Sequence, residues 1–338
     1  MRKMWLWIGG GTLFFGALVF VNNSNIFAVR PTTRATILAH RGLAQDFDRV
    51  GLQNDTCTAA RMLPPTHQYL ENTIASMRAA FEAGADIVEL DVHPTTDGQF
   101  AVFHDWTLEC RTDGHGVTRE HSMAQLKALD VGYGYTADGG RTFPFRGHGL
   151  GLMPSLDEVL TTFPRRRFLI NIKSNDPNEG RLLAAALRAR TAEEAGRLMV
   201  YGGDAPIDAL RNAMPGLRTM SRSTLKACLF SYVGYGWTGM VPPACHNSII
   251  FVPTNIAPWL WGWPDRFLER MRYVGSLVFA VGPYSGGDFS SGIDTPEDVR
   301  SLPHGYGGGI LTNDLQTVAQ ALQRSKGLGD AGPKGGAP

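Results

Sequence analysis

Residues 86–105 read DIVELDVHPTTDGQFAVFHD, and this stretch decides the expected fold. Apolar and polar residues alternate over 86–92, which is typical of a β-strand, and residues 100–104 follow as a second strand. Asp97-Gly98 between them is a strong hairpin signal. The stretch therefore predicts two paired strands, of which the first carries charged side chains in an apolar setting.

Glu89 and Asp91 point to the same face of the first strand, because successive side chains of a strand alternate between its faces. Two neighbouring carboxylates repel each other unless a cation lies between them, and oxygen ligands suit Ca²⁺ or Mg²⁺. If the turn consists of those two residues alone, His104 lies opposite Asp91. His93 shares the parity of Asp91, but it lies nearer the turn and we expect it to be more exposed. The pattern predicts a divalent cation site with a histidine beside it.

Strand and helix patterns alternate along the rest of the chain. Further strands are expected at 36–39, 168–173, 198–201, 217–220, 249–252, 277–281 and 309–312. Helices are expected at 72–83, 156–162, 180–190, 205–213, 265–273, 295–301 and 315–324. Strands that alternate with helices are parallel, and they form a doubly wound sheet or a barrel. In a barrel, side chains at the carboxyl ends of the strands meet at one mouth.

The composition excludes several classes of protein. The chain has 338 residues, of which 43% are hydrophobic, and a formal net charge of +1. The apolar fraction excludes a disordered chain. The near-zero net charge argues against a nucleic-acid-binding protein, which needs a basic face to bind phosphates. The length suits two average domains or one α/β barrel.

The N-terminal segment has the pattern of a membrane anchor. Arg2 and Lys3 precede Met4–Val21, which contains no charged side chain and suits a short transmembrane helix or the core of a signal peptide. The nearest candidate cleavage point, Ile26-Phe27-Ala28, has a bulky residue where a small one is needed, so we favour an uncleaved signal anchor. The basic residues stay in the cytoplasm, which places the rest of the chain on the extracytoplasmic side. A cleaved N-terminus would instead make the protein secreted.

The four cysteines are Cys57, Cys110, Cys228 and Cys245, and their spacing fits no zinc site. An even number of cysteines in an oxidising compartment allows two disulfides. Cys228 and Cys245 enclose a loop, 229–244, that is rich in glycine and aromatic residues. We therefore expect these two cysteines to pair, which leaves Cys57 with Cys110.

Polar side chains also end two other predicted strands. His40 and Arg41 follow residues 36–39, and Asn171 and Lys173 share one face of residues 168–173. A lysine in a strand this apolar is costly unless it meets an anion or reaches solvent. Basic groups and a cation stabilise charge on phosphorus oxygens, while imidazoles transfer protons. The two histidines, the arginine, the lysine and the carboxylate pair together therefore indicate phosphoester chemistry.

Four short motifs follow one another in a specific order: His40-Arg41-Gly42, Glu71-Asn72-Thr73, Glu89-Leu90-Asp91 and His104-Asp105. With these motifs the chain resembles the glycerophosphodiester phosphodiesterase family over residues 36–174. The later segments 294–298 and 312–314 are similar to the family's closing segment. The resemblance implies a distorted (β/α)8 TIM barrel over residues 35–325, preceded by an anchor and linker at 1–34 and followed by a disordered tail at 326–338.

The same resemblance implies an activity. Members of the family hydrolyse glycerophosphodiesters to sn-glycerol 3-phosphate and an alcohol with a divalent cation, here Ca²⁺ or Mg²⁺. By this match, His40 and His104 are the acid/base pair and Arg41 binds the phosphate. As a hypothesis, His104 removes a proton from the glycerol 2-hydroxyl and His40 protonates the departing alcohol, although direct attack by water stays open. By the same match, Glu89 and Asp91 ligate the metal ion.

Two residues near the implied metal site have auxiliary roles. Glu71 either orients Arg41 or completes the ligand shell of the metal ion, and Lys173 binds substrate. The family usually has Glu-x-Lys on the fourth strand, whereas this chain has Asn171-Ile172-Lys173. The third metal ligand is then an amide oxygen without charge, so we expect weaker metal binding.

The segment between Arg41 and Glu71 is longer than the family's common spacing. It holds Cys57, and we expect it to form a lid or a rim over the mouth of the barrel.

Two other functions stay open. A phospholipase D-like activity on lysophospholipids or sphingolipids is favoured by the anchor and by the tryptophan-rich stretch 258–263. A catalytically weak phosphodiester-binding protein is favoured by Asn171 alone. The expected partners are a small-molecule glycerophosphodiester or lysolipid and, through the N-terminal helix, the membrane, with no nucleic acid.

Overall fold

The computed structural model describes the chain except for residues 1, 30–33, 54–55, 287–290 and 330–338, and the side chains of 2–10 and 325–329 are not described either. The strands are β1 (Thr36–Ala39), β2 (Ile87–Pro94), β3 (Phe100–Val102), β4 (Arg167–Ile172), β5 (Leu198–Gly202), β6 (Arg218–Ser221), β7 (Ile249–Pro253), β8 (Leu277–Val281) and β9 (Gly309–Thr312). The helices are α1 (Arg2–Asn23), α2 (Ile74–Glu82), α3 (Met123–Lys127), α4 (Leu156–Thr162), α5 (Pro177–Arg188), α6 (Ala192–Ala195), α7 (Asp204–Ala213), α8 (Arg222–Tyr235), α9 (Asp265–Tyr273), α10 (Pro296–Ser301) and α11 (Leu315–Gly329). Helix α11 continues to Gly329, so it includes residues 326–329, which the sequence analysis assigned to a disordered tail. The rest of that tail, 330–338, lies outside the described residues.

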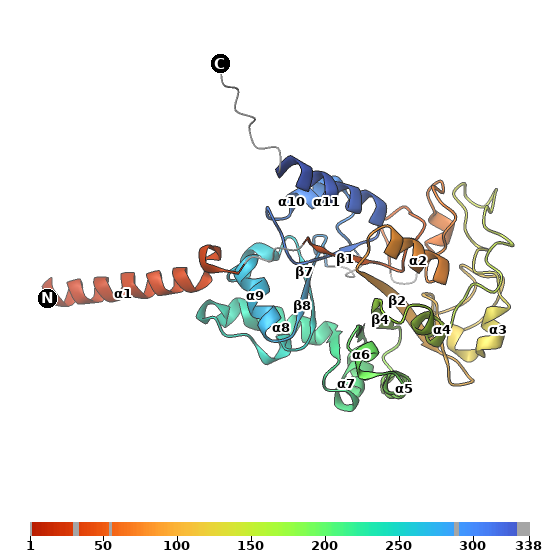
Figure 1. Ribbon diagram of the computed structural model, residues 1–338, viewed down its shortest axis with the longest axis horizontal. Helices are drawn as coiled ribbons and strands as arrows, with labels where there is room; N and C mark the ends of the chain where they lie inside the picture. Colours follow the sequence, from red (N-terminus) through yellow and green to blue (C-terminus); the bar gives the residue numbers. More distant parts are fainter. Residues whose placement is uncertain (1, 30–33, 54–55, 287–290, 330–338) are drawn as a thin grey trace, which may run out of the picture.

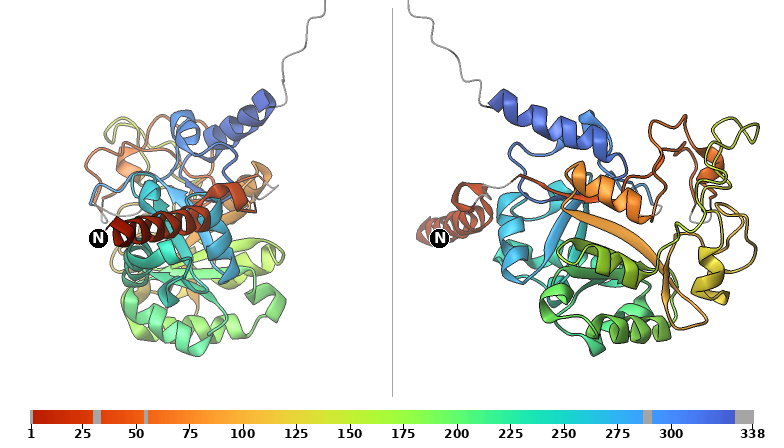
Figure 2. Two further views of the ribbon diagram at one scale, coloured as in Figure 1. Left: turned by 90° about the vertical axis from the view of Figure 1, so that its left-hand side faces the viewer. Right: turned by 45° about the vertical axis from the view of Figure 1, so that its right-hand side comes forward.

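The described strands form a nearly closed barrel. Eight of them are parallel, in the order β6-β5-β4-β2-β1-β9-β8-β7. β1 lies between β2 and β9, with Leu38 paired to Ile87 on one side and to Leu311 on the other. The two ends of the order approach each other through a parallel bridge between Thr219 of β6 and Ser248, which precedes β7. Helices surround this barrel, as expected for a TIM barrel (Figures 1 and 2).

Alternation along β2 decides which side chains enter the barrel. The even-numbered apolar residues at 88–92 pack in a cluster with α2, α4, α5 and α7. Ile87 instead joins an inner apolar layer with residues of the neighbouring strands, namely Leu38, Leu169 and Met199. Glu89 and Asp91 have the parity of Ile87 and lie nearer the carboxyl end of the strand. They therefore lie inside the barrel, between the apolar layer and the mouth.

β2 and β3 form the predicted antiparallel hairpin, but its register is shifted by one residue. Val92 pairs with Val102, so the loop spans residues 96–98 rather than the two residues that the sequence suggested. A three-residue loop with a left-handed glycine at its end is a common hairpin connection, and its extra residue moves every pairing by one. The prediction that His104 lies directly opposite Asp91 is therefore wrong, since β3 ends before His104.

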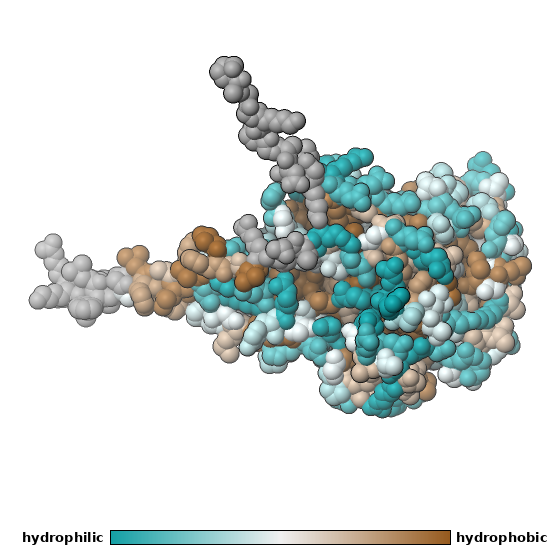
Figure 3. All heavy atoms as spheres, in the orientation of Figure 1, coloured by the Kyte–Doolittle hydropathy of each residue, from teal (hydrophilic) through white to brown (hydrophobic). Residues whose placement is uncertain are grey.

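Helix α1 projects from the end of the barrel opposite to the loops that carry α3 (Figure 1). Its last turn is attached to the barrel by Arg270, which donates to the carbonyl of Asn22 and to Asn23 Oδ1. Figure 3 shows hydrophobic residues along the described part of α1 and many hydrophilic ones on the visible face of the barrel. Among the residues with described side chains, no helix is long and apolar enough to cross a membrane. The predicted anchor at 4–21, which lies partly outside those residues, is thus not supported.

Residues 222–235 form helix α8, where the sequence analysis expected a loop from residue 229 onward. The Ser221 side chain caps the first turn, and one face of the helix is buried at Leu225, Cys228, Leu229 and Tyr232. This spacing is that of an amphipathic helix. Cys228 is bonded to Cys245 across the segment that follows α8, and the other two cysteines of the chain are bonded to each other. Both predicted disulfides are confirmed.

Two adjacent leucines of α5 test how far the barrel depends on its helical layer. Leu183 is fully buried, whereas Leu182 is 41% exposed. We expect Leu183→Ala to lower the free energy of unfolding by about 2–5 kcal/mol, because it leaves a cavity, and Leu182→Ala to lower it by less than about 1 kcal/mol. The two changes are chemically identical, so urea denaturation of both variants isolates the effect of burial. Equal losses would contradict the packing of α5 described here.

Candidate active site

The turn after β1 presents His40 and Arg41 at the carboxyl end of the barrel. Arg41 and Gly42 adopt left-handed backbone conformations, with φ of 58° and 82°. A Cβ atom at Gly42 would lie 2.6 Å from Ser76 Oγ, so a larger residue would displace the start of α2. This turn directs the backbone N–H of Arg41 to Glu89 Oε2, to which it donates at 3.2 Å.

Glu89 and Asp91 are almost completely buried, with exposed fractions of 1% and 0%. The Tyr201 hydroxyl on β5 donates to Glu89 Oε1 at 2.8 Å. Asp91 accepts from the side-chain amides of Asn171 at 2.9 Å and Asn72 at 3.1 Å. Strand β2 therefore supplies a carboxylate pair whose hydrogen-bond partners come from two neighbouring strands and from the residue before the N-cap of α2.

The two carboxyl groups have opposite pKa shifts. Burial, together with the charge of Asp91, raises the pKa of Glu89 to about 8. Burial also disfavours the ionised form of Asp91, but the Lys173 ammonium, 3.5 Å from Oδ1, and other nearby cations outweigh it and hold the pKa of Asp91 well below its usual value. Of the two alternatives for Lys173, an anion or solvent, the structure shows the Asp91 carboxylate beside it, with 20% of the lysine side chain exposed. Asp91 stays ionised, whereas Glu89 is a carboxyl group that a further cation would stabilise.

The Arg41 guanidinium lies between Glu71 and Asp91. Its Nη1 donates to Glu71 Oε1 at 3.1 Å. Its Nε is 3.3 Å from Asp91 Oδ2, yet the described residues give this buried N–H no hydrogen bond of good geometry. Burial works against the charge, but the two carboxylates raise the pKa of Arg41 above its ordinary value. A charged guanidinium at the carboxyl end of the barrel is suited to bind a phosphate oxygen.

His104 lies just beyond β3 and is oriented by the residue that follows it. Its Nδ1 is 2.7 Å from Asp105 Oδ1, which places the proton on Nδ1 and leaves Nε2 for another partner. Burial and the charge of Arg41 lower the pKa of His104, whereas Asp91 and Asp105 act in the opposite direction.

His40 is oriented by a neutral partner. Its Nδ1 is 2.6 Å from Asn313 Oδ1, and the Asn313 amide nitrogen donates to Asp294 Oδ2 at 3.0 Å. Burial, with the charge of Arg41, lowers the pKa of His40 to about 3, so the imidazole is neutral near pH 7. Its Nε2 is 3.7 Å from Glu89 Oε2. Both predicted histidines therefore reach one site, each with Nδ1 fixed and Nε2 left for chemistry.

A buried guanidinium that the sequence analysis did not identify joins the two halves of the site. Arg111 is 2% exposed, and it donates through Nη1 to Asp105 and through Nη2 to Glu71 at 3.2 Å. It thereby connects the carboxylate that holds His104 with the one that holds Arg41. Residue 111 follows a cysteine in a stretch without a strand or helix pattern, so no sequence signal pointed to it.

Other contributors were visible in the sequence without a role. Asn72 and Asn313 lie inside quoted motifs, and Tyr201 could have been found from its parity on β5. His93 was expected to be exposed, and this was wrong because it is 1% exposed. Its Nε2 is 3.4 Å from the carbonyl of His104, and its ring packs edge-on against Trp106, both from the segment that follows β3.

Known proteins are similar to this chain in sequence and in fold. Residues 40–193 match the glycerophosphoryl diester phosphodiesterase family. A glycerophosphodiester phosphodiesterase of Caldanaerobacter subterraneus subsp. tengcongensis is 37% identical over 259 residues, which make up 75% of this chain and 93% of the relative. The chain belongs to the glycerophosphoryl diester phosphodiesterase family. It is therefore a phosphodiesterase enzyme.

Solved structures of phosphodiesterases share the barrel. The glycerophosphodiester phosphodiesterase of Agrobacterium tumefaciens gives a TM-score of 0.55 at 23% identity and covers 85% of this chain and 99% of its own. A phosphodiesterase of Oleispira antarctica, solved in complex with the product sn-glycerol-3-phosphate, gives 0.55 at 17% identity and covers 86% and 97%. At these identities the likeness concerns the fold, and it confirms the TIM barrel that the sequence predicted.

The carboxylate pair fits the divalent cation that this phosphodiesterase family generally uses. In the described part of the chain, no three histidine, cysteine, aspartate or glutamate side chains form a metal-binding group. A carboxylate oxygen that accepts one hydrogen bond keeps a further lone pair, as Glu89 and Asp91 do. The side-chain amide nitrogen of Asn171 donates a hydrogen bond to Asp91. The third candidate ligand is therefore the side-chain carbonyl oxygen of Asn171. This oxygen donor set suits Ca²⁺ or Mg²⁺, with less charge than three carboxylates would have.

His93 offers a test of the electrostatics. Burial and then Lys173 lower the pKa of His93 from 6.5 to about 4. Between these values the unfolded chain binds a proton that the folded chain does not, so stability falls as the pH is lowered through this window, by up to about 1.4 kcal/mol per pH unit. We expect His93→Gln to remove this contribution.

Denaturation by guanidinium chloride in the presence of EDTA, at pH 6.5, 5.5 and 4.5, measures how the free energy of unfolding depends on pH. The free energy of unfolding of His93→Gln should fall less steeply than that of the wild type. His148→Gln, at an exposed histidine, should keep the wild-type slope. Equal slopes for all three proteins would contradict the shift.

Proposed function

We propose that the protein hydrolyses glycerophosphodiesters to sn-glycerol 3-phosphate and an alcohol, with His40 and His104 as its acid/base pair. The observation that supports this proposal is the meeting of two partly exposed imidazoles, each with Nδ1 hydrogen-bonded, with the Arg41 guanidinium in one barrel mouth. The names of the relatives from Caldanaerobacter and Oleispira support the same class of substrate.

The phosphate group is the part of the substrate that Arg41 binds, through the charge of its guanidinium. Lys173, with 20% of its side chain exposed, adds a second positive charge near the mouth. A bound phosphodiester is anionic, so it offsets the effect of Arg41 on His40. The negative charge of the bound substrate thus favours the protonated form of His40, which is the form that can donate a proton.

Proton transfer then proceeds in two steps. His104, oriented by Asp105, accepts the proton of the glycerol 2-hydroxyl, whose oxygen attacks phosphorus. His40 donates a proton to the departing alcohol oxygen, which leaves a cyclic phosphate. In the second step water opens the ring with the two histidines in reversed roles and gives sn-glycerol 3-phosphate. Direct attack by water is the alternative that needs no cyclic intermediate.

A divalent cation is part of the proposal. Glu89, Asp91 and Asn171 would hold it, and when bound it would neutralise charge on the phosphorus oxygens. The support for it is the raised pKa of Glu89, which marks a buried carboxyl group without a full positive partner.

The histidine roles can be separated by the leaving group. We expect His40→Ala and His104→Ala each to lower kcat on glycerophosphocholine by about 10²–10⁴-fold. With glycerophospho-p-nitrophenol, whose leaving group needs no proton, His40→Ala should release p-nitrophenol in a single turnover at close to the wild-type rate, and His104→Ala should not. His148→Ala at an exposed position is the control. Recovery by the His104 variant instead would reverse the roles, and wild-type rates in either variant would refute the pair.

The cation can be tested through Asn171. We expect EDTA to abolish turnover and Ca²⁺ or Mg²⁺ to restore it. Asn171→Glu should bind the active cation about tenfold more tightly, which corresponds to about 1.4 kcal/mol, because a third carboxylate joins the ligands. Asn178→Glu adds the same charge on the surface of α5 and should leave binding unchanged. Calorimetric titration measures both, and full turnover in EDTA would rule out the cation.

The lipid alternative gains no support from the tryptophan-rich stretch. Residues 257–263 line a surface groove together with Asn23, Thr254 and 301–303, and none of the site residues above lines that groove. Trp259, with 74% of its surface exposed, belongs to this groove. We retain the deacylated diester as the proposed substrate.

We also propose that the barrel works in an oxidising compartment outside the cytoplasm. The support is the pairing of all four cysteines, because disulfides persist in such compartments. Whether the N-terminus is retained or cleaved stays a prediction. Four free thiols in protein taken directly from its host would overturn the assignment.

A further inference from the structure

The segment between Arg41 and Glu71 is a folded structure rather than a loose lid. Phe47 and Met62 form an antiparallel bridge, and Asp48 pairs with Arg61 at 3.0 Å. Met62 is buried in an apolar cluster with residues of the loops that follow β3. We call the described residues of 43–70 the brace segment; residues 54–55 lie outside the description and outside this definition.

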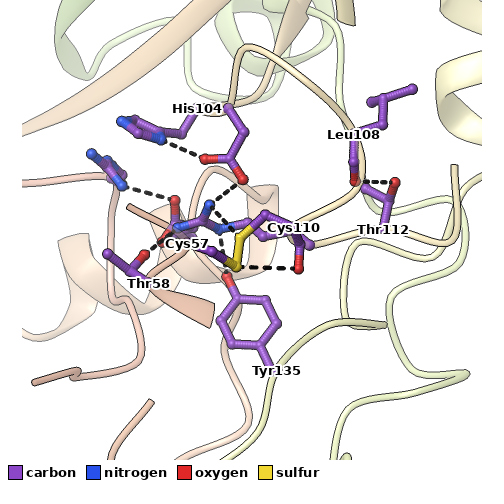
Figure 4. The surroundings of a disulfide bond; sticks show 11 residues. Cys57, Thr58, His104, Leu108, Cys110, Thr112 and Tyr135 are labelled. Atoms are coloured by element: carbon purple, nitrogen blue, oxygen red, sulfur yellow. Dashed lines mark hydrogen bonds and ion pairs between the residues drawn. A yellow bond between two sulfur atoms is a disulfide. The ribbon is translucent and has the colours of Figure 1, made fainter. Parts of the chain in front are cut away.

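The brace segment reaches the support of His104. Cys57 is bonded to Cys110, and the hydroxyl of Thr58 accepts from Arg111 Nη2. Figure 4 shows Thr58, His104 and Tyr135 gathered around this disulfide. Arg111 Nη1 in turn donates to Asp105, the partner of His104 Nδ1. The disulfide and the hydroxyl thus lie directly beside the guanidinium that orients the His104 pair.

The same segment reaches the support of His40. Arg49 Nη1 donates to Asp294 Oδ2 at 2.9 Å. Asp294 also accepts from the backbone and side-chain nitrogens of Asn313, at 2.6 and 3.0 Å. Asn313 Oδ1 is the partner of His40 Nδ1. A side chain of the brace segment is therefore connected to each proposed catalytic imidazole through two intervening residues.

Arg111 also affects the binding of phosphate. It donates to Glu71 Oε2, and Glu71 Oε1 holds Arg41 Nη1. One buried guanidinium thus fixes the carboxylate that orients His104 and the carboxylate that orients Arg41. Its loss would leave Glu71 and Asp105 buried without this cation, and both side chains would reorient.

We propose that the brace segment positions both histidines, with Arg111 as the positioning residue beside His104, Arg49 as the one beside His40, and the Cys57–Cys110 disulfide as its covalent attachment. The proposal rests on the acid/base roles proposed above. It assigns the extra segment to alignment of the reacting groups and not to closure over the substrate. Small displacements of reacting groups are costly, since about 1 Å can change a rate by about 10²-fold.

The two disulfides provide a matched comparison. Cys57→Ala with Cys110→Ala should lower kcat on glycerophosphocholine by about tenfold to a hundredfold. Cys228→Ala with Cys245→Ala removes a disulfide that lies in the α8 region and should keep kcat within about twofold of the wild type. Hydrogen exchange should increase in peptides covering 103–112 and 38–42 in the first variant and not in the second. Wild-type kcat and exchange in the first variant would overturn the brace.

Substitutions of Arg111 and Arg49 distinguish an effect on the alignment of the reacting groups from a general loss of stability. Arg111→Gln should lower kcat and raise KM, since it frees both Asp105 and Glu71, and Arg111→Lys should recover part of both. Arg49→Gln should lower kcat alone, because its contacts lead to His40 and not to Arg41. Adding Arg111→Gln to Asp105→Asn should lower kcat little further than Asp105→Asn alone, because Arg111 acts on His104 through Asp105. Full additivity, or an unchanged kcat in Arg49→Gln, would contradict the proposed roles.

The design separates this proposal from the proposed function. If the wild type does not hydrolyse glycerophosphocholine, the function fails, while the exchange measurements still decide whether the brace fixes residues 103–112 and 38–42. If the double cysteine variant does not fold, two single variants that keep the disulfide, Thr58→Val and Arg49→Gln, take its place in the kcat and hydrogen-exchange measurements. Wild-type kcat and exchange in these two single variants would overturn the brace.

Discussion

The structure depends on keeping several carboxylates ionised inside a barrel. Transfer of an ion from water into a protein interior costs several kcal/mol even after relaxation, unless an opposite charge and hydrogen bonds compensate. Four buried or nearly buried carboxyl groups surround the mouth: Glu71, Glu89, Asp91 and Asp105. The cations that contact them through ion pairs in the described residues are Arg41, Arg111 and Lys173. Much of the local chain, including the left-handed turn at Arg41, serves to bring these groups together.

This balance of charge explains how the site divides its roles. Asp91 has Lys173 and Arg41 beside it and stays ionised, and Glu71 and Asp105 share Arg111. Glu89 is the carboxyl group of the four that has no arginine or lysine ion pair among the described residues, and its pKa is raised. The surplus negative charge is therefore located where the proposed cation would bind. A site of this kind is stable without the cation because a proton can take its place on Glu89.

Orientation of the imidazoles is the second constraint. Each proposed catalytic histidine has its Nδ1 occupied by an oxygen, anionic for His104 and neutral for His40, and each oxygen belongs to a side chain that is itself held. These chains of contacts end in the brace segment, which the disulfide attaches to the loop after β3. The barrel provides the positions of the strand ends, whereas the loops provide the directions of the side chains.

Much of the fold and of the candidate site could be predicted from the sequence alone. Parity along residues 86–92 placed Glu89 and Asp91 on one face, the alternation of strands and helices indicated the barrel, and the ordered motifs from His40 to His104 indicated the family. These features are local, because the period of a strand and the residues of a motif do not depend on distant contacts. Helix α8 was missed although Leu225, Cys228, Leu229 and Tyr232 have helical spacing, because glycines and aromatic residues near them favoured a loop.

The tertiary structure alone decided what joins the pieces. The one-residue shift of the hairpin arose from its loop, and the burial of His93 arose from the segment that packs over it. Arg111 gained its place from Asp105 in its own loop and from Thr58 and Glu71 in the distant connection between β1 and α2. Such contacts join residues far apart in the sequence, and no local period encodes them. Packing of the loops on the barrel, and not the pattern of any strand or helix, therefore determined how the site is supported.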